Sequence, residues 1–256
     1  MADRMGDIFA RSLCAGVALA LSAAVATAAE IRVVSVGALQ SALKPIGADY
    51  AKQGGDQVSY TFTNPANLKK VLADGQFDLI IAAAPSVEEL DKSGGLQAGS
   101  RSKAVRVGIG VAVREGAPKP DVSTPDTFKK AIMAARNIVY TDPATPNGSG
   151  VVTMRILTAA GLVDMLKAKG KPEGLGPAKE LIAKGEYEMG LFNISEATIP
   201  GVVVAGPVPA PLQDYTHYDA AVLAGAANKD AAASFLKYVT GKPAVAAWRA
   251  AYIDAE

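Results

Sequence analysis

Cysteine, histidine and tryptophan each occur only once in this 256-residue sequence. The single cysteine, Cys14, lies in an N-terminal segment that we expect to be removed, which excludes disulfides and thiolate metal sites from the remaining chain. The single histidine, His217, argues against a zinc site, because catalytic zinc is held by several histidine or carboxylate ligands. We therefore expect neither a metal ion nor a cofactor.

The chain also lacks an excess of either charge, since it has 26 basic and 25 acidic residues and a net charge of +1. Without a basic stripe the chain lacks the electrostatic footprint of a nucleic-acid-binding protein. Beyond the N-terminal segment no apolar run reaches the roughly 18 residues of a membrane-spanning helix, so we expect a soluble mature chain without a membrane span. The nucleophile elbow Gly-x-Ser-x-Gly and the phosphate-binding loop are absent as well.

The first 29 residues follow the order charged, apolar, small that is typical of an export signal. Arg4 and Arg11 precede an alanine-rich apolar run that ends near Ala26, and this run is shorter than the roughly 20 residues that span a bilayer. A buried helix or a membrane anchor is the alternative. Cys14 precedes most of the run, whereas a lipoprotein cysteine would follow it. We predict a signal peptide over 1–29 and a periplasmic protein.

Strand-like and helix-like segments alternate along the rest of the chain, a pattern typical of βαβ units around parallel sheets. Two long apolar strands, 105–113 and 202–208, separate two such series. We predict an α/β protein of two lobes joined by a two-strand hinge, with residues 30–105 plus 206–256 in lobe 1 and 106–205 in lobe 2. A single doubly wound sheet is the alternative. The other predicted strands are 31–36, 58–62, 79–83, 138–141 and 189–192, and the predicted helices are 39–53, 66–73, 127–135, 150–160, 178–184, 231–239 and 244–251.

Strand-to-helix junctions are the candidate ligand-binding segments. The carboxyl ends of parallel strands meet at one edge of a sheet, and the first amides of a helix are unpaired and favour anions. Plain capping and turn roles are the alternative at each single position. Together the junctions predict a cleft between the lobes whose candidate ligand-binding residues are Gly37, Ala38, Leu39, Asn64, Pro65, Ala66, Asn67, Ala83, Ala84, Ser149, Gly150 and Asn193.

Several of these segments resemble one known family. The run after the first strand (37–43), the third strand (78–83), the loop 142–150 and the segment 189–193 are similar in type and order to molybdate-type periplasmic solute-binding proteins. The resemblance covers nearly the whole mature chain. It implies the type II periplasmic-binding-protein fold, a small anion held by amides and hydroxyls, an ABC permease as partner, and a monomer.

The sequence departs from that family at the positions expected to hold the ligand. Ala38 stands where the family has an oxyanion-binding serine, and Asn64-Pro65-Ala66 replaces a serine cluster. Asn193 corresponds to the family's tyrosine, and Ser149 to a small residue. Because hydroxyl donors are lost at two positions, we expect a small organic carboxylate rather than molybdate.

An enzyme is the alternative, because the same family includes aconitate isomerase-like members that interconvert cis- and trans-aconitate. Such a reaction needs a base for an allylic proton and donors that stabilise the resulting anion. Glu196 and Asp142 are the candidate bases, and Lys103 and Arg155 are candidate partners of substrate carboxylates. Each of these four has a surface or capping role as its alternative, and His217 is interpreted as part of a surface turn.

Overall fold

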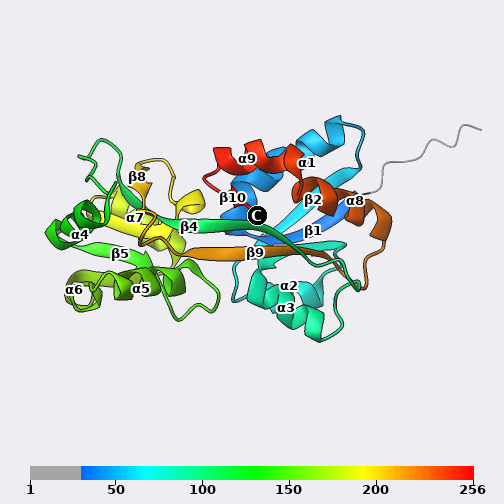
Figure 1. Ribbon diagram of the computed structural model, residues 1–256, viewed down its shortest axis with the longest axis horizontal. Coiled ribbons are helices and arrows are strands. Elements are labelled where there is room, and N and C mark those ends of the chain that lie inside the picture. The colour runs from blue at the N-terminus through cyan, green and yellow to red at the C-terminus, as the bar shows by residue number, and fades with distance from the viewer. Residues whose placement is uncertain (1–29) are drawn as a thin grey trace, which may run out of the picture.

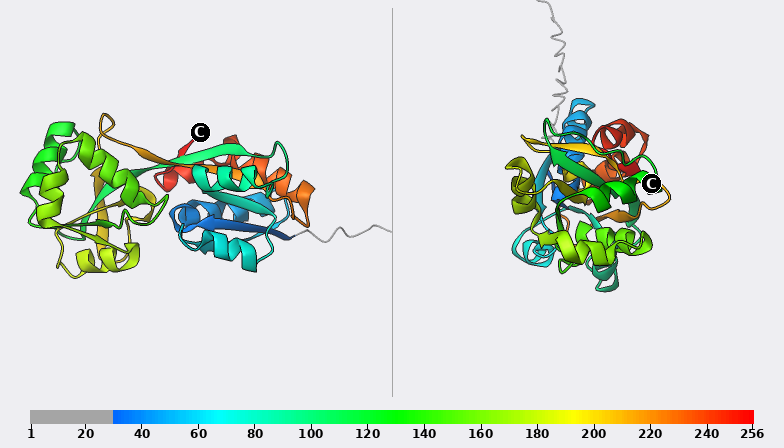
Figure 2. Two further views of the ribbon diagram at one scale, coloured as in Figure 1. Left: turned by 90° about the horizontal axis from the view of Figure 1, so that it is seen from below. Right: turned by 90° about the vertical axis from the view of Figure 1, so that its left-hand side faces the viewer.

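A computed structural model of the chain describes residues 30–256, which form two α/β lobes lying end to end (Figures 1 and 2). The predicted signal peptide, 1–29, lies outside the described residues. Within 30–256, no helix combines the length and the apolar character needed to cross a membrane. The α/β class and the two-lobed arrangement predicted from the alternating pattern are confirmed.

Lobe 1 is built on the parallel strands β1 (Glu30–Val36), β2 (Gln57–Thr63) and β3 (Leu79–Ala83), followed by the antiparallel strand β9 (Tyr215–Val222). One face carries the helices α1 (Gln40–Lys52), α8 (Lys229–Val239) and α9 (Val245–Ala250), and the other carries α2 (Leu68–Asp74) and α3 (Ala84–Lys92) (Figure 1). Each face has its own core, one around Phe235 and Trp248 and the other around Leu68 and Val87. The short elements are η1 (Gly37–Leu39), η3 (Lys242–Ala244) and β10 (Asp254–Ala255).

Lobe 2 repeats this layering on the parallel strands β5 (Ile138–Thr141), β6 (Gly170–Glu173) and β7 (Met189–Asn193). Its helices are α4 (Pro125–Ala134), α5 (Ser149–Ala159), α6 (Val163–Lys169) and α7 (Leu175–Ala183), with the turn η2 (Ile194–Glu196) and the strand β8 (Val202–Pro207). One core contains Phe128 and Ile156, and the other contains Phe192 and Ile182. Both lobes are therefore three-layered units with apolar strands between helices.

A single long strand, β4 (Ser102–Arg114), belongs to both lobes. It pairs with β9 from Ser102 to Gly108 and with β7 and β8 from Ile109 onward. The chain returns from β8 to β9 through residues 208–214, which makes the second connection. At this crossing the Gln213 side chain accepts a hydrogen bond from the Ile109 amide and donates one to the Ile109 carbonyl, each at 2.9 Å. The lobe boundaries at 105/106 and 205/206 stay predictions.

Four elements of four or more residues within 30–256 were not predicted: α3, α6, β6 and β9. The predicted strand 79–83 ends where expected, and Pro85 then occupies the first turn of α3, where proline is well tolerated because its missing amide would be unpaired there. The segment around His217 is strand β9 and not a surface turn. Its alternation of buried Thr216, exposed His217 and buried Tyr218 is the signal that its polar composition obscured.

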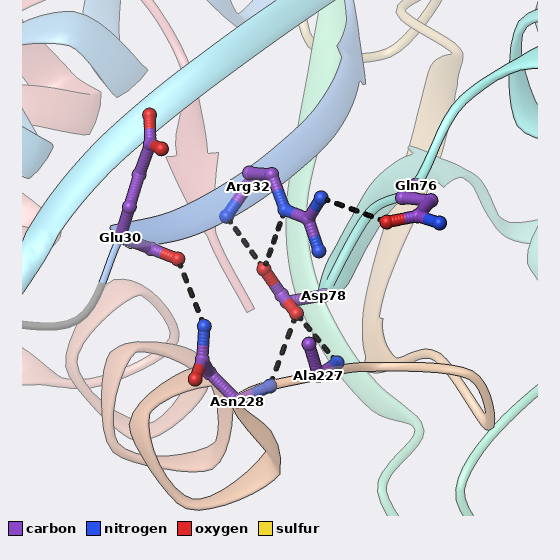
Figure 3. A network of polar contacts seen from close by, with 6 residues as sticks. All are labelled: Glu30, Arg32, Gln76, Asp78, Ala227 and Asn228. Carbon is purple, nitrogen blue, oxygen red and sulfur yellow. Dashed lines mark hydrogen bonds and ion pairs between the residues drawn. The ribbon is translucent and has the colours of Figure 1, made fainter.

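A buried carboxylate joins β1, β3 and the start of α8 within lobe 1 (Figure 3). Asp78, immediately before β3, is fully buried and accepts hydrogen bonds from the main-chain amides of Arg32 (2.9 Å), Ala227 (2.9 Å) and Asn228 (3.2 Å). The Arg32 guanidinium adds an ion pair at 3.4 Å. Asp78 therefore fixes β1 and the start of α8 to β3.

Candidate functional site

A cleft of about 620 Å³ lies between the lobes, at the carboxyl ends of the parallel strands. Lobe 1 contributes the ends of β1 and β2, lobe 2 contributes the ends of β5, β6 and β7, and Tyr218 comes from β9. The cleft is lined by Val36, Gly37, Ala38, Gln40, Phe62, Thr63, Asn64, Pro65, Ala66, Asn67, Thr141, Thr145, Asn147, Gly148, Ser149, Glu173, Gly174, Leu175, Asn193, Glu196 and Tyr218.

Most of the predicted ligand-binding residues line this cleft, namely Gly37, Ala38, Asn64, Pro65, Ala66, Asn67, Ser149 and Asn193. Four others do not. Leu39 is fully buried in the lobe 1 core, and Ala83 and Ala84 line a smaller neighbouring pocket. Gly150 is buried where the first turn of α5 crosses the end of β5, and a side chain there would overlap the Thr141 carbonyl. That glycine positions α5 rather than lining the cleft.

Two parts of the lining were missed because their strands were missed. The segment Glu173–Leu175 joins β6 to α7, and neither β6 nor this junction was predicted. Tyr218 enters from β9. The remaining lining residues without a prediction lie at or near the same strand-to-helix junctions, namely Val36, Gln40, Phe62, Thr63, Thr141, Thr145, Asn147 and Gly148. Their position at the ends of predicted strands is the signal from which they could have been predicted as lining residues.

A polar cluster occupies the wall between η2 and β9. The Asn193 amide nitrogen donates to the Glu196 carboxylate at 3.0 Å and lies 3.5 Å from the Tyr218 hydroxyl. The Asn193 side-chain oxygen is buried and has no partner among the described residues. Burial raises the pKa of Glu196, although the Asn193 hydrogen bond and the charge of Lys179 act in the opposite direction. Burial also raises the pKa of Tyr218, and the neighbouring Glu196 adds to that effect.

Glu173 is the other carboxyl group of the cleft, and its surroundings differ. It accepts a hydrogen bond from the Gly174 amide at 3.0 Å and pairs with Lys171 at 3.0 Å, and both contacts hold its pKa below the ordinary value. Of the described residues that line the cleft, none is lysine, arginine or histidine. The polar lining is therefore mostly neutral amides and hydroxyls, with one carboxyl group whose pKa is lowered and one whose pKa is raised.

The other candidate side chains lie outside the cleft lining. Arg155 pairs with Asp214 at 2.5 Å, Lys103 is exposed, and His217 Nδ1 lies 3.0 Å from the Glu256 carboxylate. Asp142 accepts a hydrogen bond from the Ala144 amide at 2.9 Å and is not among the lining residues. Of the two candidate bases, only Glu196 lies in the cleft.

Hydrogen bonds cross between the lobes on two sides of the cleft. The Ser195 hydroxyl donates to the Ala38 carbonyl at 2.7 Å, and the Asn147 amide donates to the Ser86 hydroxyl at 3.2 Å. Asn147 adopts a positive φ of 57°, a conformation that asparagine tolerates better than most residues. These contacts hold η1 against η2 and the loop before α5 against α3.

Comparison with known proteins gives a consistent result. The family model described as "Bacterial extracellular solute-binding protein" matches residues 31–252. An aconitate isomerase from a Pseudomonas species is 28% identical, over 85% of this chain and 84% of its own length. The molybdate-binding protein ModA of Azotobacter vinelandii is 26% identical, over 88% of this chain and 89% of its own length. The solved periplasmic molybdate-binding protein of Azotobacter vinelandii superposes with a TM-score of 0.69 at 22% identity, covering 86% of this chain and 97% of that one.

Proposed function

Because this chain belongs to the bacterial extracellular solute-binding proteins, we propose that it captures a small organic carboxylate in the periplasm and delivers it to an ABC-transporter permease. The cleft between the lobes is the proposed ligand site, and the eight predicted residues that line it remain its proposed contacts. A binding protein of this kind closes around its ligand by bending at its hinge.

The single observation that carries the proposal is the chemistry of the cleft lining. Its donors are neutral: the side chains of Asn64, Asn67 and Asn147, the hydroxyl of Thr141, which accepts from the Ser149 hydroxyl, and main-chain amides at Gly37 and at the start of the 11-residue helix α5. Such donors stabilise an anion without a basic partner. The absence of a hydroxyl at Ala38 supports a planar carboxylate over a tetrahedral oxyanion.

A ligand screen tests this proposal. The melting temperature of the purified protein is measured with small mono- and dicarboxylates, molybdate, tungstate and sulfate, each at the same concentration. We expect stabilisation by one or more carboxylates, because a ligand that binds only the folded state raises its stability by mass action. Stabilisation by molybdate or tungstate alone would overturn the carboxylate assignment.

A second candidate function is isomerisation of aconitate, favoured by one specific observation: Glu196 lies in the cleft beside Tyr218. A carboxyl group with a raised pKa is suited to remove and return a proton near neutral pH. The similarity to an aconitate isomerase, which is below 30% identity, supports keeping this candidate. The neutral lining argues against it, since a tricarboxylate usually needs basic partners.

Turnover distinguishes the two candidates. The protein is incubated with cis-aconitate and, separately, with trans-aconitate, and both isomers are followed by chromatography. Interconversion that is lost in Glu196→Gln would establish the isomerase. Thermal stabilisation by a carboxylate without any interconversion would support the binding protein.

A further inference from the structure

The Glu196 carboxyl group, when ionised, repels any anion bound in the cleft. Its Oε1 atom lies 3.0 Å from the position that a side chain on Gly37 would occupy, so this oxygen borders the space in front of η1. Its Oε2 atom accepts the hydrogen bond from Asn193. A carboxylate ligand held at the Gly37 end of the cleft therefore meets the Glu196 carboxyl directly, and two like charges in contact disfavour each other's ionised form.

The groups that face Glu196 do not remove this conflict. Lys179 of α7 donates from its ammonium to the Glu196 main-chain oxygen at 3.0 Å rather than to the carboxyl oxygens. Tyr218 of β9 is neutral near pH 7, because burial raises its pKa. Glu173 of β6 is a second negative charge at the cleft, and it is already paired with Lys171.

The remaining elements packed on η2 add no opposite charge. The turn η1 consists of Gly37, Ala38 and Leu39, none of which titrates. Of the charged side chains of β4, Arg106 pairs with Asp254 at 3.4 Å, and Lys103 and Arg114 are exposed. Within residues 30–256, the excess negative charge of an occupied cleft is therefore most simply removed by a proton.

We propose that Glu196 takes up one proton when a carboxylate binds, and that the resulting neutral acid donates a hydrogen bond to the ligand. The step is Glu196–COO⁻ plus a proton from solvent plus the ligand anion, giving neutral Glu196–COOH beside the bound anion. No covalent bond to the ligand forms. Because Oε2 already accepts from Asn193, the proton resides on Oε1, which faces the Gly37 side of the cleft. This inference rests on the proposed carboxylate-binding function and adds a proton to it.

Proton uptake makes affinity depend on pH. If one proton binds with each ligand, the dissociation constant rises about tenfold per pH unit once the pH exceeds the pKa of Glu196 in the free protein. Below that pKa the constant is flat. Glu196→Gln keeps a neutral donor in nearly the same shape and cannot titrate, so its affinity should stay near the low-pH value of the unchanged protein at every pH.

Acetate is the probe, since it is the smallest organic carboxylate and stays ionised between about pH 6 and pH 9. Its dissociation constant is measured across that range by NMR titration of the purified protein, of Glu196→Gln, and of Glu173→Gln. Glu173→Gln is the matched control, because it removes the other cleft carboxylate, whose pKa is lowered. It should change the dissociation constant by the same factor at every pH and leave the pH dependence of that constant unchanged.

The outcomes separate this inference from the function on which it rests. A pH-dependent affinity that becomes flat only in Glu196→Gln supports proton uptake at Glu196. Acetate binding with the same pH dependence in Glu196→Gln, or with no pH dependence in the unchanged protein, overturns the inference and leaves carboxylate binding intact. Failure of all three proteins to bind acetate or any carboxylate of the thermal screen overturns both.

Discussion

Two carboxyl groups, Asp78 in lobe 1 and Glu196 in lobe 2, are both withdrawn from water, yet their pKa values are shifted in opposite directions. Asp78 lies at the amino end of β3, away from lobe 2, and Glu196 approaches the carboxyl ends of the strands from lobe 2. Burial acts to raise the pKa of both. At Asp78 the amides of Arg32, Asn228 and Ala227 and the Arg32 guanidinium outweigh burial, so its pKa is lowered. At Glu196 the single Asn193 bond and the charge of Lys179 do not, so its pKa is raised.

The difference lies in how many donors the fold commits to each group. Asp78 has its hydrogen-bonding capacity filled by the protein itself, which leaves nothing for a ligand and makes it a structural element. Glu196 keeps one oxygen at the cleft and has one side-chain donor. A buried carboxyl group whose hydrogen-bonding capacity is only partly filled lowers the stability of the fold. Such a group is expected in a binding site, which must leave polar atoms available for a ligand.

Removing the charge of Asp78 should cause the largest loss of stability. We expect Asp78→Asn to lower the free energy of unfolding by about 3–5 kcal/mol, because it breaks a buried ion pair. It also places the side-chain NH₂ group against main-chain amides that themselves donate, so that buried donors lose their acceptor. Urea denaturation measures this loss. Since the folded pKa of Asp78 is lowered, its contribution is present above its ordinary pKa and is lost as pH falls, so the deficit of the variant should shrink in acid.

Asp254→Asn is the matched control for that substitution. Asp254 also pairs with an arginine, Arg106, and the two ion pairs have the same nitrogen-to-oxygen distance of 3.4 Å, but Asp254 is 54% exposed whereas the Asp78 side chain is 0% exposed. An exposed pair contributes at most about 1 kcal/mol. Equal effects of the two substitutions would show that burial does not distinguish the Asp78 end of the molecule.

The cleft end should be sensitive to backbone position rather than to charge. Gly150 and Gly176 are each the second residue of a helix, α5 and α7. A methyl group on Gly150 would overlap main-chain atoms of Thr141 and Asp142, whereas one on Gly176 meets nothing within 4 Å. We expect Gly150→Ala to cost about 1–3 kcal/mol and to weaken ligand binding by displacing α5. Gly176→Ala should be neutral or stabilising by up to about 1 kcal/mol. Urea denaturation of both variants tests this, and equal stabilities would contradict it.

Elements with a clear local hydrophobic pattern could be predicted from the sequence. Strands with continuous apolar character, such as β3 and β4, and helices with clear periodicity, such as α8, were predicted because local patterning determines them. The junctions after β1 and β2 were predicted as ligand-binding segments because strand ends meet at one edge, and they line the cleft. Whether they bind a ligand stays a prediction.

The rest depended on contacts that a single sequence does not reveal. Strand β9 is polar in sequence, and its inclusion in the sheet comes from pairing with both β3 and β4. The role of Gly150 follows from the crossing of α5 over β5. The position of Glu196 facing Gly37 is set by the approach of the two lobes, which residues distant in sequence determine. Local pattern therefore located the ends of strands and not the partners that face them.

The smallest effect expected in this comparison is a change in the pH dependence of stability at the cleft end. The folded pKa of Glu196 is raised, so its contribution to stability is fully present below its ordinary pKa and is lost as pH rises through the folded value. Glu196→Gln cannot ionise. Its stability relative to the unchanged protein should therefore improve as pH rises from about 5 toward 8. Urea denaturation of the ligand-free proteins at a series of pH values measures this.

Glu173→Gln is the control and should show no such improvement, because the pKa of Glu173 is lowered. Parallel pH profiles for Glu196→Gln and the unchanged protein would mean that folding does not raise the pKa of Glu196, and the contrast with Asp78 would not hold.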